Sequence, residues 1–470
     1  MSSLETDYLI VGAGASGLAF ADEMLLHSNA HLTLVDRRAV PGGHWNDAYS
    51  FVRLHQPSVM YGVGSRDLGD QTIDHDGPNA GYLGLSSGPE VTEYFHKVLE
   101  ERLLPSGRVT WLPAHDFAGN NTLRNLETGE THKVHVRRKT VNAAHLTNSI
   151  PKTHTRNFEV APGVACVPPN ELPNLLGTFE QFTVLGNGKT AMDTCIWLLS
   201  QGVPTERIRW VISRDCWLWN RAFTQPEERF FEVVFRGFLN RQRAIAEATS
   251  PEDMALRFEK IGMWMRIDPE VDPTVYRGAT MSEREIEMLR TIKDTVRLGR
   301  VQKIAPGNMH LERGKVSAPV DMLYIDCTAS AVHGDNSPPV PVFQGDTIIL
   351  QMIRFPQIPF SAALTAYLET LLETDAEKNR FTEPIALEDT MEGFVRSLVP
   401  DFTNRLNASM HPDVRRWVNA SRLDIYAHTG AKVAREDTAK RAILNDLREA
   451  NFAAAANLTK LIADLNLRAA

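Results

Sequence analysis

The sequence predicts an α/β protein in which two strand–helix–strand units are joined to mostly helical chain. Two observations carry this prediction. A Gly-rich turn comes directly after a short apolar run near residue 10, and a second turn of the same kind follows another apolar run near residue 185. Apolar runs of this length that contain β-branched residues are typical of strands buried on both faces of a parallel sheet.

The first unit carries a complete dinucleotide-binding pattern. Residues 8–11 are expected to form a strand, residues 18–27 a helix, and residues 31–35 a second strand that ends at Asp36. Glycines at the first, third and sixth positions of the turn allow a tight turn, close approach to a pyrophosphate, and close packing of the helix, whose N-terminus attracts phosphate. The acid at the end of the second strand is placed to bind a ribose hydroxyl. The expected ligands of this nucleotide are Gly12, Gly14, Ala15, Ser16, Gly17 and Asp36.

The second unit repeats this pattern with two changes. Its turn, residues 186–191, ends in alanine instead of glycine, and its second strand is followed by Arg214 where the first unit has an acid. A carboxylate there would repel the 2′-phosphate of NADP, whereas an arginine would pair with it. The sequence therefore favours NADPH at this unit. Its expected ligands are Gly186, Gly188, Lys189, Thr190 and Arg214.

The second turn has two other interpretations. Gly188-Lys189-Thr190 matches the end of a P-loop, but a P-loop needs a glycine where Thr183 stands. The other alternative, which the sequence leaves open, is a degenerate repeat that no longer binds a nucleotide.

The composition argues against several classes of protein. Lys and Arg number 50 against 58 Asp and Glu, a net charge of −8, which disfavours nucleic acid as a partner. Four scattered cysteines suit neither a disulfide framework nor a Cys-rich zinc site, and no histidine pair stands at metal spacing beside carboxylates, so no metal is expected. The chain has no run of 18 uncharged apolar residues and no signal-peptide pattern, so no membrane partner is expected and a cytoplasmic location is predicted.

The two units together resemble the two-dinucleotide-binding flavoproteins, and within them the flavin-containing and Baeyer–Villiger type (class B) monooxygenases. The resemblance also rests on residues 36–38, on Pro41-Gly42-Gly43-His44-Trp45, and on a late apolar stretch, residues 321–329. It implies FAD at the first unit and NADPH at the second. It further implies that NADPH reduces the flavin and that a peroxyflavin formed with molecular oxygen oxygenates a small organic substrate. The additional flavin contacts that it implies are Arg37, Gly43, His44, Trp45, Gln56, Thr328 and Ala329.

Three residues are candidates for a catalytic role. In the monooxygenases a segment shortly after the Gly-Gly-x-Trp brings a polar residue to the flavin ring, and His55 and Gln56 lie at the comparable place. Together with Trp45 they are candidates to hydrogen-bond the flavin or its oxygen adduct. The alternative is that His55 and Gln56 are loop residues that hold backbone groups.

The chain departs from this family ahead of the second turn, because residues 160–171 lack the family's Phe-x-Gly…His signature. Two further functions therefore stay open. One is an FAD oxidase or dehydrogenase whose second nucleotide site is vestigial. The other is a non-catalytic, nucleotide-sensing binding protein.

The expected domain order follows from the positions of the two units. Residues 1–178 are predicted to form the first part of an FAD-binding domain, with a β-meander made of residues 109–112 and 123–141. Residues 179–299 are predicted to form the NAD(P)-binding domain, with a helical insertion at about 222–297. The chain is expected to return to the FAD-binding domain over 300–360. The helical region 361–470 is a candidate cap for the active site or an interface for a second copy of the chain.

Overall fold

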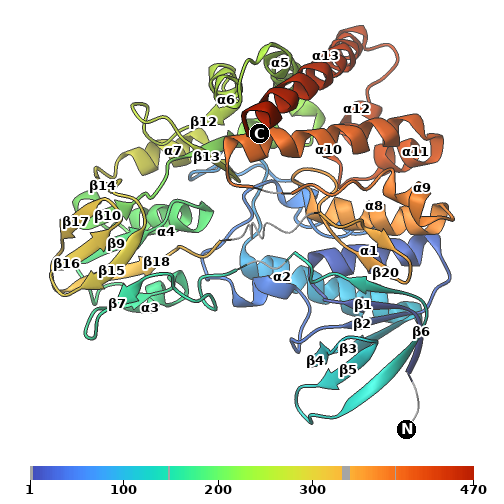
Figure 1. Ribbon diagram of the computed structural model, residues 1–470, viewed down its shortest axis with the longest axis horizontal. Coiled ribbons are helices and arrows are strands. Elements are labelled where there is room, and N and C mark those ends of the chain that lie inside the picture. Colours follow the sequence, from blue (N-terminus) through green and yellow to red (C-terminus); the bar gives the residue numbers. More distant parts are fainter. Residues whose placement is uncertain (1–3, 147–148, 331–338, 387, 470) are drawn as a thin grey trace.

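The computed structural model describes residues 4–146, 149–330, 339–386 and 388–469. It confirms the predicted fold class. Two α/β units lie side by side, and helices of the C-terminal region, orange and red in Figure 1, lie across both. Within the described ranges no helix is both long and apolar enough to cross a membrane.

The first unit is built on a sheet with the strand order β19-β20-β6-β1-β2-β3. Strands β20, β6, β1, β2 and β3 run parallel, as the Gly-rich turn requires. The elements of this unit that come before the second unit are β1 (Leu4–Val11), α1 (Ala15–His27), β2 (Leu32–Val35), α2 (Gly88–Lys97), β3 (Val109–Leu112), β4 (His115–Phe117), β5 (Thr122–Asn125) and β6 (Thr131–Asn142). Those that come after it are β19 (Phe343–Gln344) and β20 (Thr347–Ile349).

Both faces of this sheet are covered. On one face, α1 and α8 (Ile358–Leu371) pack together, and Tyr8, Phe20 and Phe360 share one core. On the other face, β4, β5 and the first half of β6 form an antiparallel meander and bury Leu9 and Leu123. Residues 109–112, which were expected in this meander, form β3 of the parallel sheet instead. Burial on both sides explains why β1 and β2 are continuous apolar runs instead of alternating ones.

The second unit has a parallel sheet with the strand order β14-β10-β9-β18-β8. An antiparallel set, β15–β17, packs beside it together with β7. The elements are β7 (Glu159–Val160), β8 (Cys166–Val167), α3 (Leu172–Leu175), β9 (Gln181–Leu185), α4 (Lys189–Ser200), β10 (Ile208–Val211), β14 (Asp294–Val296), β15 (Val301–Ala305), β16 (Asn308–Leu311), β17 (Gly314–Ser317) and β18 (Met322–Asp326).

The chain was expected to return to the first unit from residue 300, and the position of β18 shows that this expectation is wrong. This strand pairs in parallel with β9 and β8, so residues 322–326 lie in the second sheet. The chain rejoins the first sheet only at β19 and β20. Strands β7 and β8 also belong to the second unit, although they precede the boundary expected at residue 178. These two-residue strands pair with partners more than 140 residues away, and local sequence patterns do not predict such pairing.

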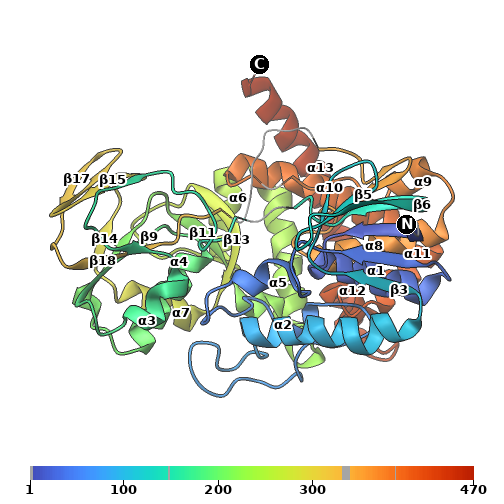
Figure 2. The same cartoon turned by 90° about the horizontal axis from the view of Figure 1, so that it is seen from below.

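The insertion after β10 is helical only in part. It contains α5 (Phe231–Glu247), α6 (Pro251–Lys260) and α7 (Glu283–Arg290), but also a small sheet of β11 (Cys216–Asn220), β12 (Trp264–Met265) and β13 (Val275–Met281). Helices α5 and α6 form a third core with α10 (Met391–Met410) and α13 (Thr438–Ala469), centred on Trp264 and Phe394. The C-terminal end of α13 extends beyond the rest of the molecule in Figure 2.

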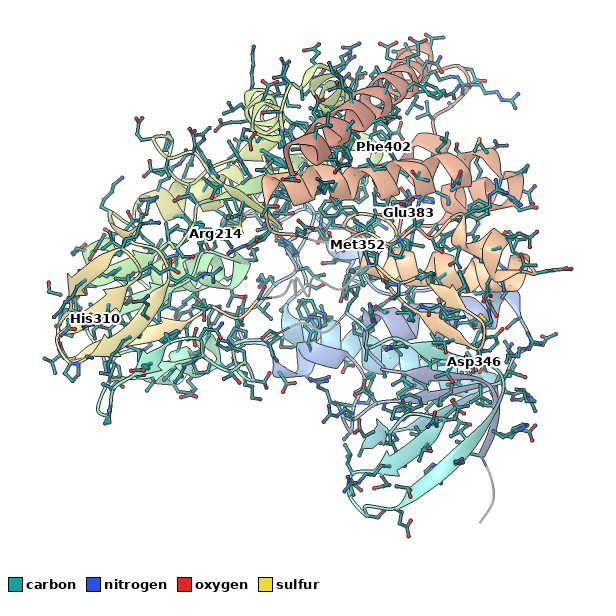
Figure 3. All side chains as sticks on the ribbon, in the orientation of Figure 1. Arg214, His310, Asp346, Met352, Glu383 and Phe402 are labelled. Carbon is teal, nitrogen blue, oxygen red and sulfur yellow. The ribbon has the colours of Figure 1, made fainter. Side chains whose placement is uncertain are left out.

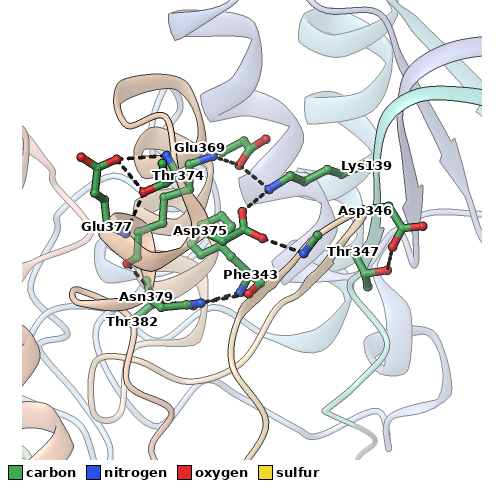
Figure 4. A network of polar contacts seen from close by, with 12 residues as sticks. Lys139, Phe343, Asp346, Thr347, Glu369, Thr374, Asp375, Glu377, Asn379 and Thr382 are labelled. Atoms are coloured by element: carbon green, nitrogen blue, oxygen red, sulfur yellow. Dashed lines mark hydrogen bonds and ion pairs between the residues drawn. The ribbon is translucent and has the colours of Figure 1, made fainter.

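The remaining C-terminal helices fasten this region to the first unit. They are α9 (Asp375–Asn379), α11 (Pro412–Ala420) and α12 (Ile425–Ala431). Lys139 of β6 lies at the centre of a buried polar network (Figure 4), where its Nζ is 2.7 Å from a carboxylate oxygen of Asp375 and 3.3 Å from one of Glu369. The Nζ of Lys378 approaches the same oxygen of Glu369 at 2.7 Å. The network ties α8 and α9 to the first sheet.

Candidate functional site

The first Gly-rich turn has the geometry of a phosphate-binding turn. Gly12 has a positive φ of 112°, and its N–H donates to the carbonyl of Val35 at 2.8 Å. A Cβ on Gly17 would lie 1.9 Å from the carbonyl oxygen of Gly12, so only glycine permits this helix–turn contact. Gly14 stands at the N-cap of α1, and no side chain in the described part of the chain caps the helix there. The first-turn N–H groups, those of half-buried Ala15 and Ser16 among them, are therefore free to bind an anion.

The carboxylate of Asp36 faces the same turn. It accepts hydrogen bonds from the backbone N–H of Ala13 at 2.7 Å and of Arg38 at 2.8 Å, and the residue is only 8% exposed. These bonds hold it beside the place where the ribose of a dinucleotide binds in this fold. Arg37, by contrast, points to the surface, where its Nε is 3.4 Å from Asp116. The structure does not bring Arg37 to the turn.

The Gly-Gly-His-Trp segment lies against the first turn. Gly43 has a φ of 58°, and a Cβ there would come within 3.1 Å of the Cα of Gly14, which is closer than an ordinary contact, so this approach favours glycine at position 43. His44 stacks on Trp45, with ring centroids 5.5 Å apart. Burial, and then the charge of Arg38, lower the pKa of His44 below its ordinary value. His44 is therefore neutral at pH 7.

Trp45 is anchored by its indole N–H. The Nε1 atom donates to the hydroxyl of Tyr61 at 2.9 Å, and the two rings meet edge to face. Burial raises the pKa of Tyr61 to about 12, so the phenol stays protonated. The N–H of Trp45 is thus engaged inside the protein, and the ring is left to shape the site.

One contact of the first turn was missed in the sequence. Ala143, directly after β6, lies 3.3 Å from the Cβ position of Gly12, and its N–H donates to the carbonyl of Val11 at 2.9 Å. The late stretch ending in Thr328 and Ala329 was expected in this place. Ala143 could have been predicted from the apolar stretch that ends near residue 142, if that stretch had been recognised as a third parallel strand of the sheet.

The second turn reproduces this arrangement. Gly186 has a φ of 114°, its N–H donates to the carbonyl of Val211 at 3.0 Å, and a Cβ on it would lie 2.7 Å from the carbonyl oxygen of Cys327. Gly188 is the N-cap of α4, and the space beside its Cα is open, with no described atom within 4 Å of a Cβ. The backbone of Cys327 thus packs against Gly186 in the same way as the backbone of Ala143 packs against Gly12.

Thr328 and Ala329 therefore lie at the edge of the second sheet and not of the first. The N–H and the hydroxyl of Thr328 both donate to Asp326, at 3.0 and 2.7 Å. Ala329 follows on the crossing back to the first unit. The physical reason for the correction is the pairing of β18 with β9.

Lys189 and Thr190 open helix α4 and face the first unit. The ammonium of Lys189 pairs with Asp193 one turn along, and the same carboxylate accepts a hydrogen bond from the hydroxyl of Tyr49 at 2.8 Å. Burial raises the pKa of Asp193 and, together with the charge of Asp193, that of Tyr49. Perturbed groups of this kind cluster at functional sites, and here they lie where the two units meet.

His55 lies at the same junction. Its Nδ1 accepts a hydrogen bond from the backbone N–H of Thr280 at 3.1 Å. Burial, and then the charges of Lys189 and Arg221, lower the pKa of His55 to about 3. The ring is therefore neutral, and because Nδ1 is an acceptor, its proton is on Nε2. Gln56 is half-buried beside it and makes no side-chain hydrogen bond to another described residue.

Arg214 comes two residues after Ile212, past the end of β10, and belongs to a cluster of charged side chains. It pairs with Asp389, which also lies 3.2 Å from a guanidinium nitrogen of Arg277. The other terminal nitrogen of Arg277 donates to the side chain of Asn187, in the second turn, at 2.8 Å. Arg214 was predicted from the sequence, whereas Arg277 and Asp389, which lie 63 and 175 positions further along the chain, were not.

Comparison with known proteins adds three findings. A family profile for an NAD(P)-binding Rossmann-like domain matches residues 10–97. The chain is 40% identical over 460 residues to the uncharacterized proteins Rv2000 of Mycobacterium tuberculosis and Mb2023 of Mycobacterium bovis, and each match covers 98% of this chain and 85% of the relative.

The third finding concerns solved structures. An open crystal structure of cyclohexanone monooxygenase is similar with a TM-score of 0.51 at 12% identity, covering 87% of this chain and 98% of that chain. An ε-caprolactone-bound structure of the same enzyme gives a TM-score of 0.52 at 13% identity with the same coverage. The chain therefore belongs to the family of the mycobacterial protein Rv2000, and it has a class B flavin monooxygenase-like fold.

Proposed function

We propose that this protein is an FAD- and NADPH-dependent monooxygenase that oxygenates a small organic substrate with molecular oxygen. The observation that carries the proposal is the pair of equivalent turns at Gly14 and Gly188, each of which leaves a helix N-terminus open at the carboxyl edge of a parallel sheet. In open α/β sheets this edge is where nucleotides bind. When bound, the two cofactors supply hydride transfer and the activation of oxygen.

The residues of the first unit fit FAD. The open N–H groups at the start of α1 would hold the pyrophosphate, because the missing side chains at Gly14 and Gly43 leave room for close approach. Asp36, held by two backbone N–H groups, would accept a hydrogen bond from the ribose. Trp45, fixed by Tyr61, would form a wall beside the ring system.

The residues of the second unit fit NADPH. The start of α4, with the open space beside Gly188, would hold its pyrophosphate. Arg214 and Arg277 supply the positive charge that a 2′-phosphate requires. Lys189 contributes a further cation at the helix N-terminus.

His55 would act as a hydrogen-bond donor between the two cofactors. Its ring is fixed by Thr280, and its Nε2 carries a proton that stays in place across the physiological pH range because the ring does not ionise there. A preorganised neutral donor can stabilise negative charge that develops on oxygen without giving up a proton.

Spectroscopy of the purified protein tests the proposal. We expect a bound flavin, rapid loss of its absorbance when NADPH is added without oxygen, and return of the absorbance when oxygen is admitted. If the flavin is bleached by organic substrates but not by NADPH, the protein is an oxidase or dehydrogenase and the monooxygenase proposal fails. If the protein binds no flavin even in excess FAD, both assignments fail.

A further inference from the structure

Two arginines of the second unit converge on one carboxylate of the C-terminal region. Figure 3 shows Arg214 on the side of the second unit that faces α10. Its guanidinium pairs with Asp389, and Arg277 of β13 approaches the same carboxylate oxygen at 3.2 Å. The three side chains are each between 26 and 34% exposed, so solvent reaches the cluster.

This cluster is attached directly to the second turn. Arg277 donates to the side-chain oxygen of Asn187 at 2.8 Å, and the amide nitrogen of Asn187 contacts the backbone carbonyl of Arg214. The end of the second strand of such a unit is the place that distinguishes a ribose 2′-hydroxyl from a 2′-phosphate. The carboxylate of Asp389 therefore holds the two cations that a 2′-phosphate would need.

Asp389 comes from a different part of the molecule. It directly precedes Thr390, whose hydroxyl caps α10 by accepting the N–H of Gly393 at 2.9 Å. The backbone carbonyl of Asp389 accepts the N–H of Tyr276 at 3.3 Å, which fixes the main chain beside β13. Although burial alone would raise it, Arg214 and Arg277 keep the pKa of Asp389 below its ordinary value, so the group is ionised at neutral pH.

We propose that Asp389 sets the nucleotide selectivity of the second site by competing with the 2′-phosphate of NADPH for Arg214 and Arg277. NADH has no phosphate at this position, so its binding leaves the ion pairs intact. NADPH binding has to displace the carboxylate, which reduces the advantage that two arginines would otherwise give it. The inference rests on the proposed function, because it requires that the second unit binds a nicotinamide nucleotide.

Calorimetric titration of the full-length protein with NADP+ and NAD+ tests the proposal without catalysis. We expect Asp389→Asn to lower the Kd for NADP+ about fivefold and to leave the Kd for NAD+ nearly unchanged, since removing a partly exposed ion pair of this kind is worth about that factor. The matched control is Asp294→Asn, which removes the ion pair to Arg209 on the same sheet. It should change neither constant.

A second measurement on the unmodified protein does not depend on how the variant folds. Amide exchange in residues 389–393 should become faster when NADP+ is added and not when NAD+ is added. The inference fails, and the proposed function stands, if the protein binds both nucleotides but Asp389→Asn leaves the ratio of the two dissociation constants unchanged. The same holds if amide exchange in residues 389–393 is equal in the NADP+ and NAD+ complexes. If the unmodified protein binds neither nucleotide, the proposed function falls together with it.

Discussion

At the scale of single residues, the glycines of the two turns have different roles despite their shared pattern. Gly17 is required by packing, because any Cβ there would overlap the carbonyl oxygen of Gly12. Gly188 has an ordinary φ of −82° and open space around it, so the fold itself tolerates a methyl group there. Its missing side chain matters only to a ligand.

This difference gives the first prediction. Gly17→Ala should destabilise the protein by more than about 3 kcal/mol, because backbone must move to relieve the overlap. Gly188→Ala should stay within about 1 kcal/mol of the parent protein but lose NADPH binding. Denaturant unfolding and NADP+ titration measure the two effects. Equal loss of stability in both variants would contradict the packing argument.

The neutral state of His55 makes a second prediction, on pH. The pKa of this ring is about 3 in the folded protein and about 6.5 in the unfolded chain, so between these values the unfolded chain binds a proton that the folded protein does not. The free energy of unfolding therefore falls as the pH is lowered through this window, by about 1.4 kcal/mol per pH unit. From pH 6 to pH 5 the parent protein should lose about 1 kcal/mol more than His55→Asn.

Denaturant unfolding at the two pH values measures this difference. The control is the same substitution at the exposed His75, which should leave the pH dependence of the parent protein unchanged. An identical pH dependence in the parent protein and in His55→Asn would show that His55 is protonated in the folded state.

At the scale of elements, one arginine holds residues 59–66 of the first unit. Arg422 donates to the backbone carbonyls of Val59, at 2.5 Å, of Tyr61, at 3.2 Å, and of Val63 and Arg66. Four backbone carbonyls are thus fixed by one half-buried guanidinium from the C-terminal region, whose Nε also lies 3.2 Å from Asp67. The loop that carries them follows directly on from His55.

Replacement of this arginine is the third prediction. Arg422→Ala should cost about 2–4 kcal/mol and increase amide exchange over residues 59–67, because buried carbonyls lose a charged donor. Arg416→Ala is the control, since Arg416 is exposed and, among the described residues, forms an ion pair with Asp413 alone, on the same helix. It should cost less than about 0.5 kcal/mol. Unchanged exchange in Arg422→Ala would show that the loop is held by other contacts.

The elements also show where prediction from sequence ends. The strands of both turns were predicted, because a buried parallel strand is a continuous apolar run followed by glycine. Strands β12 and β13 were missed within the segment 222–297, which was expected to be helical, since Trp264 and Tyr276 are buried by a third core that no local pattern reveals. Likewise, Ala143 and Asp389 reach the site through pairing and packing between distant segments.

At the scale of the whole molecule, the two units are joined through a buried arginine. Arg221 is fully buried and pairs with Glu285 at 2.8 Å. It also donates to the backbone carbonyl of His55 at 3.2 Å and to the side chain of Asn79 at 3.0 Å, both in the segment between β2 and α2 of the first unit. The segment between β2 and α2 of the first unit therefore meets the insertion of the second unit at the guanidinium of Arg221.

The fourth prediction concerns this junction. Arg221→Met should cost about 3–5 kcal/mol, because it leaves the carboxylate of Glu285 buried without its partner. The double variant Arg221→Met/Glu285→Gln should recover part of that loss, since no charge is then stranded. Denaturant unfolding of the parent protein, the single variant and the double variant measures how much stability is recovered. Equal stability of the single and double variants would show that the carboxylate is not the cause.

The chain crosses between the units twice, and the two crossings lie together. The carboxylate of Asp326 contacts His154 in the first crossing at 3.0 Å and Thr328 in the second at 2.7 Å. The N–H of Ser149 also donates to the carbonyl of Ser330 at 3.2 Å. These contacts fasten the two crossings to each other at the end of β18.

The late strand β20 has a consequence for synthesis of the protein on the ribosome. All strands of the second sheet lie between residues 166 and 326, whereas the first sheet stays incomplete until residues 347–349 have joined β6. The sheet of the second unit can therefore form before β20, the last strand of the first unit's sheet, has been synthesised. The nascent chain then inverts the usual order, in which N-terminal domains mature first.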